Sequence, residues 1–199
     1  MCSWCWGFAP TVESIWQRFG DALPIRLMMG GLRPGTTKLL DEAGRRTIRQ
    51  HWEHVREASG QPFDFRFFER ENFIHDTEPA SRAVVVVRRA AGLAEPLAFL
   101  HRVQAAFYAE NRDVTEEQVL ADLAAQSGFD RETFLQTFRG EEAQMEAWHD
   151  FASAQRAGIT GFPTLIAGVG EGAPYALVTQ GYQLPDCLIP PLARWLETA

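Results

Sequence analysis

The chain has 199 residues, 46% of them hydrophobic and 23% charged, and its formal net charge is −7 at pH 7. This length suits one sizeable core, or one core with a large insertion, and the absence of any low-complexity stretch excludes fibrous and disordered classes. The acidic balance argues against a nucleic-acid partner, and the longest apolar run, Val84 to Val87, is far shorter than the roughly 18 residues of a membrane span.

The first part of the chain predicts a helix followed by a strand. Apolar residues recur at helical spacing over residues 5–19, with Cys2 at or near the N-cap and Pro10 as an internal kink. The short apolar segment 24–29 ends at two glycines and predicts a buried strand. A polar, charged helix is expected over residues 42–59.

Residues 63–67 carry three phenylalanines that alternate with other residues, which predicts a short strand. Beyond it, residues 77–157 read as an all-helical block of about five helices. Thr77 and the following proline mark the start of the first helix, and this start signal outweighs the strand preference of the four valines. The later helix signals are the span 95–111, a capping box at 115–118, the cap Asp130 and the span 141–157.

The last part of the chain, after the helical block, carries strand and turn signals. Residues 164–167 and 175–180 predict two strands around a glycine-rich turn, which together form a hairpin. A closing helix is expected over 188–196, with Pro190 and Pro191 confined to its first turn.

Two of the three cysteines form the motif Cys2-Ser3-Trp4-Cys5 at the head of the first helix. A thiol there meets free backbone N–H groups and the positive end of the helix dipole, which favour the thiolate. The second cysteine lies one turn behind, where it can attack a mixed disulfide formed at the first. Because the intervening residues supply no cation, we expect the helix terminus to be the main cause of a lowered Cys2 pKa.

Other readings of the cysteines and charged residues are less favoured. A zinc site needs two more ligands at suitable spacing, and none is evident, so we expect no metal. His51 and His54 are expected on a solvated helical face. Cys187 is read as a small buried residue, with a second redox or regulatory thiol as the alternative. Arg88 is read as an ordinary helix-surface charge.

The cysteine motif, the segment 76–83 and the motif Gly161-Phe162-Pro163-Thr164 together resemble the DsbA-like thioredoxin-fold oxidoreductases, in particular the FrnE-type disulfide isomerases. The resemblance covers essentially the whole chain. It implies an α/β fold of the thioredoxin type, with an all-helical insertion between the βαβ and ββα halves. The domains are then residues 1–76 with 158–199, and the inserted residues 77–157.

The same resemblance assigns the site residues. It implies that Cys2 is the nucleophile, that Cys5 resolves the mixed disulfide, and that Pro163 is a cis-proline beside them. The backbone of Phe162 is expected to pair with an extended substrate segment. Trp4 is expected to be exposed and to contact substrate, whereas Trp6 is expected to pack.

The family has a β-strand directly before its cysteine motif, and here that first strand is missing because only Met1 precedes Cys2. In this fold such a strand lies inside the sheet. We therefore expect the natural protein to begin upstream of Met1.

The function predicted is that of a thiol–disulfide oxidoreductase or isomerase acting on protein or peptide disulfides. No cofactor is expected beyond the redox-active dithiol, with glutathione or a thioredoxin-type reductant as a candidate co-substrate. A cytoplasmic location is expected, with no nucleic-acid or membrane partner. The alternatives are a glutathione-linked isomerase or transferase of the kappa or hydroxychromene-carboxylate isomerase type, and a non-catalytic peptide-binding domain.

Overall fold

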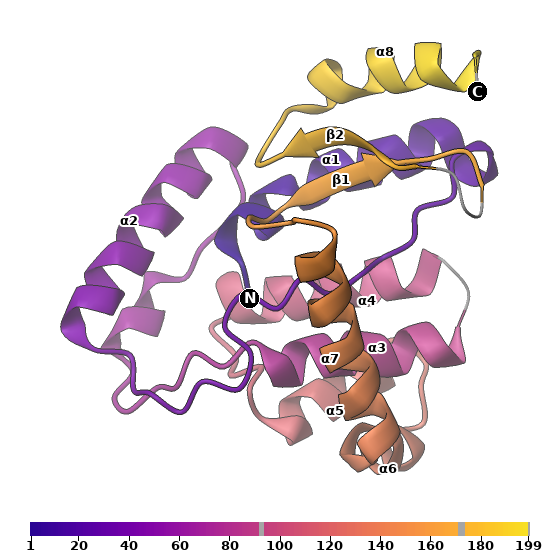
Figure 1. Ribbon diagram of the computed structural model, residues 1–199. Helices are drawn as coiled ribbons and strands as arrows, with labels where there is room; N and C mark the ends of the chain where they lie inside the picture. The colour runs from indigo at the N-terminus through magenta and orange to yellow at the C-terminus, as the bar shows by residue number, and fades with distance from the viewer. Residues whose placement is uncertain (92–93, 171–173, 199) are drawn as a thin grey trace.

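The computed structural model describes residues 1–91, 94–170 and 174–198 (Figure 1). Within these ranges the chain forms helices and one two-stranded sheet, in the order α1 (Ser3–Phe19), the 3₁₀ helix η1 (Gly20–Ala22), α2 (Glu42–Ser59), the 3₁₀ helix η2 (Phe65–Glu69), α3 (Glu78–Ala90), α4 (Ala94–Tyr108), α5 (Glu117–Gln126), α6 (Arg131–Arg139), α7 (Glu141–Arg156), β1 (Thr164–Ala167), β2 (Ala176–Gln180) and α8 (Pro185–Leu196). None of the helices in the described ranges is long and apolar enough to cross a membrane.

The helix α1 takes part in two hydrophobic cores. Its Trp6 lies in the larger core, which the inserted helices α3 to α7 dominate. Its Phe8 and Ile15 pack in the smaller core against α8, with the hairpin strands β1 and β2 alongside. Figure 1 shows α8 and the hairpin on one side of the molecule and the inserted helices on the other. The N-terminus of α1 therefore lies where the two parts meet.

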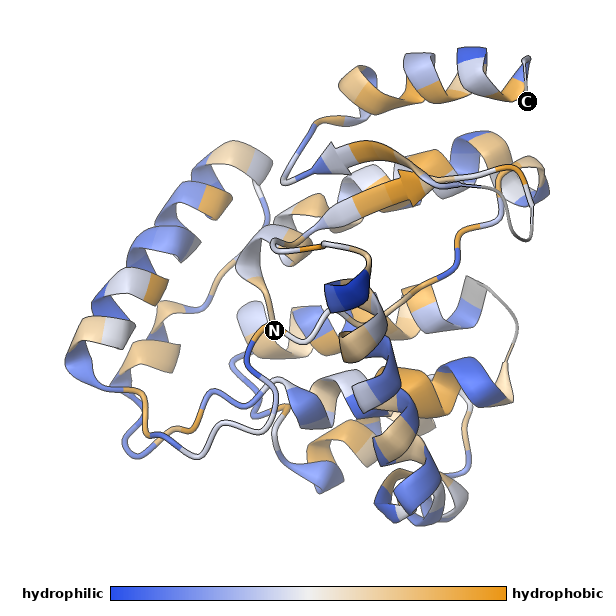
Figure 2. Cartoon of the chain, viewed as in Figure 1, coloured by the Kyte–Doolittle hydropathy of each residue, from blue (hydrophilic) through white to orange (hydrophobic). Residues whose placement is uncertain are grey.

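The helix α2 packs on α1 through a narrow apolar stripe. Its buried residues are Ile48, Trp52 and Val55, and in Figure 2 the rest of the helix is mostly hydrophilic. The two helices approach closely at Gly7, where a Cβ atom would lie 2.7 Å from Cγ1 of Val55. Glycine at this position is what allows the contact.

The helix α3 confirms the prediction that the four valines are helical. Residues 83–87 are all 5% exposed or less, so the middle of this helix is buried on every side. A helix surrounded by other helices gains enough from burial to outweigh the strand preference of β-branched side chains. Five helices, α3 to α7, span residues 78–156, as expected for the helical block.

The strand expected over residues 24–29 does not form. The backbone there has no ladder partner in the described chain, and two of its polar groups bond to side chains instead. The N–H of Met29 donates to Asp150 at 2.9 Å, and the carbonyl of Leu27 accepts from Arg88 at 2.9 Å. The antiparallel sheet of β1 and β2, with a bulge between Leu165 and Ile166, is the hairpin that the sequence predicts.

The strand expected over 63–67 is also wrong. Residues 65–69 form the 3₁₀ helix η2, capped by the side chain of Asp64, which accepts from the N–H of Arg66. Phenylalanines of this segment surround the indole of Trp52, with ring centroids 4.9 to 6.0 Å away. A flat strand would send alternate rings to opposite faces, so packing around one tryptophan favours the tight turn.

Several predicted helix ends also move. The capping box at 115–118 is not formed, because the hydroxyl of Thr115 donates to Asp113 and α5 starts at Glu117. The helix α4 ends at Tyr108, three residues before the predicted 111. The helix α8 starts at Pro185, so Pro190 and Pro191 lie inside it and not in its first turn.

Arg88 is not an ordinary surface charge. Its guanidinium donates to both oxygens of Asp150, at 2.6 and 3.2 Å, and to Glu146 at 2.6 Å. Asp150 is only 4% exposed. The Arg88–Asp150 pair joins α3 to α7. Through the N–H of Met29 and the carbonyl of Leu27, the same two side chains hold the segment 24–29 against both helices.

His75 makes stability depend on pH. Its side chain lies among aromatic rings with neither ring nitrogen paired. Burial, assisted by the positive charges of the N-terminal ammonium and then of the Arg33 guanidinium, lowers its pKa from 6.5 to about 3. Between these values the unfolded chain binds a proton at His75 that the folded chain does not bind. The contribution of the neutral His75 side chain to the free energy of unfolding is therefore complete above pH 6.5. It is lost as the pH falls towards 3, by up to about 1.4 kcal/mol per pH unit.

We expect His75→Leu to flatten this part of the pH dependence of the free energy of unfolding, measured by urea titration between pH 4 and pH 7. His54→Gln, on the exposed face of α2, serves as the control and should keep the wild-type slope. Equal slopes in wild type and His75→Leu would contradict the assignment.

Candidate active site

The site begins at the N-terminus of α1. Cys2 is the N-cap residue in an extended conformation, and its sulfur accepts the backbone N–H of Cys5 at 3.4 Å. A side chain that caps a helix in this way has its acceptor atom among the free N–H groups of the first turn. The prediction that Cys2 caps the helix is therefore confirmed.

The loop before β1 closes the site from the other side. The peptide bond between Phe162 and Pro163 is cis, and Pro163 is buried. The thiol of Cys2 donates to the carbonyl of Phe162, with the sulfur 3.6 Å from the oxygen. These two residues are 160 positions apart in the chain. The two motifs that the sequence singled out are thus brought into contact.

The two thiols have opposite electrostatic environments. The pKa of Cys2 is lowered from 9.0 to about 7, first because the Cys5 thiol donates a hydrogen bond to it, and then because backbone N–H groups of Cys5 and Trp4 favour the thiolate against the effect of burial. The hydrogen bond to Cys2 and burial raise the pKa of Cys5 well above its usual value. The main cause of the lowered Cys2 pKa is therefore the neighbouring Cys5 thiol, and not the helix terminus that the sequence suggested.

This asymmetry fits a division of roles. The lowered pKa of Cys2 favours its thiolate, and a thiolate is the nucleophile in disulfide exchange. The raised pKa of Cys5 favours its protonated form. All three cysteines of the chain are free thiols in this structure.

The tryptophans of the first turn differ in exposure. Trp4 is half-buried against Tyr182, with the ring centroids 5.8 Å apart, so it is less exposed than expected. Tyr182 donates its hydroxyl to the carbonyl of Ala58 at 3.0 Å. Sequence reasoning missed Tyr182, because no local pattern connects the residues after β2 with the first helix. Trp6 packs as predicted and donates to the carbonyl of Pro62.

The remaining candidates lie outside this site. Cys187 is exposed in the first turn of α8, so its reading as a buried residue is wrong. His51 and His54 are exposed on α2, as expected for a solvated face. In the described part of the chain, no three His, Cys, Asp or Glu side chains are grouped as metal ligands.

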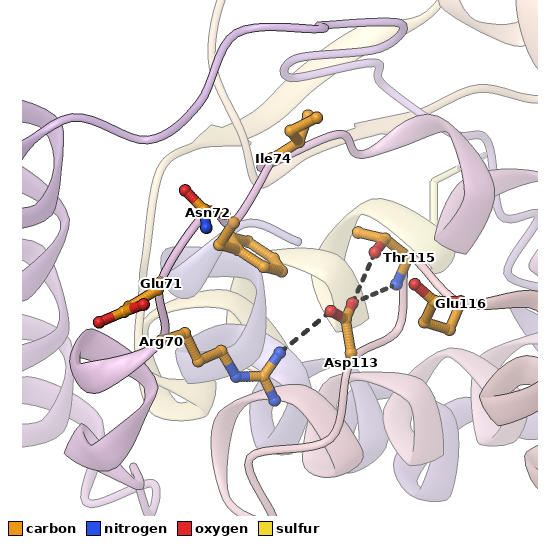
Figure 3. Close-up of a pocket in the computed structure, with 8 residues that line it drawn as sticks. Arg70, Glu71, Asn72, Ile74, Asp113, Thr115 and Glu116 are labelled. Carbon is orange, nitrogen blue, oxygen red and sulfur yellow. Dashed lines mark hydrogen bonds and ion pairs between the residues drawn. The ribbon is translucent and has the colours of Figure 1, made fainter.

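A separate cavity of about 440 Å³ lies between the segment before α3 and the start of α5 (Figure 3). Arg70 and Asp113 on its wall pair with each other at 3.3 Å, and Asp113 also accepts from the N–H and hydroxyl of Thr115. None of the lining residues belongs to α1 or to the Phe162 loop. This cavity is therefore separate from the site formed by the cysteines and the Phe162 loop.

The family described as "DSBA-like thioredoxin domain" matches residues 1–180 of the chain. Among solved structures, a protein from Nitrosomonas europaea that is proposed to be a protein disulfide isomerase is 36% identical, with a TM-score of 0.91 over 100% of this chain and 94% of that one. The cytosolic disulfide reductase DsbM from Pseudomonas aeruginosa is 27% identical, with a TM-score of 0.80 over 100% and 96% of the two chains. A structure of DsbM with glutathione is also similar, with a TM-score of 0.77.

Two further similarities are more distant. A 2-hydroxychromene-2-carboxylate isomerase has a TM-score of 0.66 at 15% identity, over 98% of this chain and 90% of that one, which shows a shared fold. The ClpXP adapter protein SpxH of Bacillus subtilis (strain 168) is 22% identical over 169 residues, which are 83% of this chain and 54% of that protein. The chain thus spans about half the length of the curated relatives it matches.

Proposed function

The chain belongs to the family of DSBA-like thioredoxin domains, and from this premise we propose that it is a thiol–disulfide oxidoreductase that works as a reductase. The observation that carries the proposal is the position of the Cys2 sulfur, which accepts the N–H of Cys5 and faces the carbonyl of Phe162. An activated thiol next to a backbone that can pair with an extended segment suits protein or peptide disulfides as substrates.

The proposed cycle transfers two electrons. The Cys2 thiolate attacks one sulfur of the substrate disulfide, the substrate S–S bond breaks, and one substrate thiolate leaves. Cys5 then loses its proton and attacks the Cys2 sulfur, which releases the second substrate thiolate and leaves a Cys2–Cys5 disulfide. Two molecules of glutathione, or one dithiol of the thioredoxin type, reduce this disulfide and are oxidised in turn.

The reducing direction and a cytoplasmic location are proposed from the similarity to DsbM, which is named as a cytosolic disulfide reductase and has a solved structure with glutathione. Phe162 through its backbone and Trp4 through its indole are the proposed substrate contacts. Pro163 is proposed to hold the loop beside the thiols.

The test is the reduction potential of the Cys2–Cys5 pair, measured by equilibration in mixtures of reduced and oxidised glutathione and followed by mass after alkylation. A reductase is expected at about −230 mV or below, whereas a strong oxidant lies near about −120 mV. Reversible disulfide formation and turnover with a dithiol reductant are both expected. Failure of the pair to form a disulfide would refute the proposal.

A second candidate is peptide binding without turnover, which the similarity to the SpxH adapter proteins favours. A variant that lacks both Cys2 and Cys5 would keep its affinity for peptides under this hypothesis. For the glutathione-linked isomerase alternative, the similarity to the hydroxychromene-carboxylate isomerase shows the fold and carries no argument on chemistry.

A further inference from the structure

The ring of Phe162 lies directly on the backbone of Gly30. A Cβ atom at Gly30 would lie 2.0 Å from Cε1 of Phe162 and 2.4 Å from its Cζ, which is closer than non-bonded atoms can approach. The ring of Phe162 therefore occupies the space that any other residue at position 30 would fill. Nothing in the sequence pattern connects these two positions, which lie before α2 and before β1.

The segment that carries Gly30 is held in place by buried groups. The neighbouring Met29 donates its N–H to Asp150, and Arg88 donates to the carbonyl of Leu27 while pairing with the same carboxylate. Because both side chains belong to the packed helices α3 and α7, this backbone cannot move easily away from the Phe162 ring.

The other end of Phe162 faces the reactive thiol. Its carbonyl accepts from Cys2, 3.6 Å from the sulfur. A displacement of the ring that is passed to the backbone would therefore move this oxygen relative to Cys2. It would also turn the N–H and carbonyl of residue 162 that are proposed to pair with substrate.

We propose that Gly30 is a positioning residue of the active site, whose bare backbone seats the Phe162 ring and thereby fixes the Phe162 carbonyl beside the Cys2 sulfur. The inference rests on the proposed function for its consequence on turnover. Its geometric part, the link from position 30 to the surroundings of Cys2, stands independently of turnover.

The test is Gly30→Ala in the otherwise unchanged chain, assayed with a fluorogenic disulfide-bonded peptide and excess dithiothreitol. We expect kcat/KM to fall by about tenfold or more, since misplacing a binding group by about 1 Å can cost about 100-fold. The loss is expected mainly in KM, because the substrate loses backbone partners. A merely destabilised enzyme would instead lose kcat through a smaller active fraction.

A second readout does not depend on turnover. The rate at which iodoacetamide alkylates Cys2 is measured against pH, and Gly30→Ala is expected to lower the apparent pKa of Cys2. The physical reason is that the carbonyl of Phe162 accepts from the protonated thiol and stabilises that form. If the proposed function fails, wild-type turnover is absent while this shift remains.

The matched comparison is the same substitution in a Phe162→Ala background, where the ring is gone. There Gly30→Ala should change neither KM nor the alkylation profile. Gly44→Ala, in the first turn of α2, controls for steric crowding away from the site, because its Cβ would lie 2.8 Å from Cδ1 of Leu40. This variant should leave activity unchanged. The inference is overturned if the ring rotates aside and both readouts of Gly30→Ala equal wild type, or if the effects persist without the ring.

Discussion

Replacing Cys2 by serine is expected to lower disulfide reduction by about 10⁴-fold or more, the order of loss that follows removal of a catalytic nucleophile. The reason is that Cys2 alone combines a pKa of about 7 with a place at the helix N-cap. A serine hydroxyl can still accept the N–H of Cys5, so the helix should keep its cap and the fold should be preserved. The measurement is the steady-state reduction of a peptide disulfide with dithiothreitol.

The partner and control variants make this result specific. Cys5→Ser should still react once, since Cys2 remains, but should accumulate a Cys2–substrate disulfide that mass spectrometry detects. Cys187→Ser should retain wild-type activity, because this thiol is exposed in the first turn of α8, whereas Cys2 and Cys5 lie at the start of α1. Turnover by Cys2→Ser at the wild-type rate would assign the chemistry elsewhere.

Asp150→Ala is expected to lower the free energy of unfolding by about 3–5 kcal/mol, the usual cost of removing one partner of a buried ion pair. Asp150 is 4% exposed, and the Arg88 side chain is 24% exposed. The substitution leaves the N–H of Met29 without its acceptor and leaves Arg88 with Glu146 as its remaining carboxylate. The measurement is urea unfolding followed by circular dichroism.

Two further variants separate the contributions at this position. Asp150→Asn keeps one oxygen for the N–H of Met29 but replaces the other acceptor of Arg88 by an NH2 group and removes the charge, so its loss of stability should be smaller than that of Asp150→Ala. Glu142→Ala breaks the exposed pair with Arg89, in which the glutamate is 77% exposed, and should change the free energy of unfolding little, because solvent screens this pair. If Asp150→Ala were no more destabilising than Glu142→Ala, the Arg88–Asp150 pair would not hold the segment 24–29.

Interactions between residues close in the chain account for the parts of the site that were predictable. The capping of α1 by Cys2 depends on atoms within three residues, so the motif itself predicts where the thiol lies. The hairpin and most helices follow from turn residues and from apolar periodicity. The combination of the cysteine motif with Gly161-Phe162-Pro163-Thr164 indicated the family, which the match over residues 1–180 confirms.

The sequence by itself thus indicated the fold family, through the resemblance of its motifs, and most of the helices and the hairpin, because capping, turn and periodicity signals are local. Only the tertiary structure decided that residues 24–29 pair with Asp150 and Arg88 and form no strand, that phenylalanines wrap Trp52, and that Cys187 is exposed. It also decided that Phe162 rests on Gly30. In each case the deciding contact joins residues far apart in the chain or depends on what covers them, and such partners leave no periodic trace in the sequence.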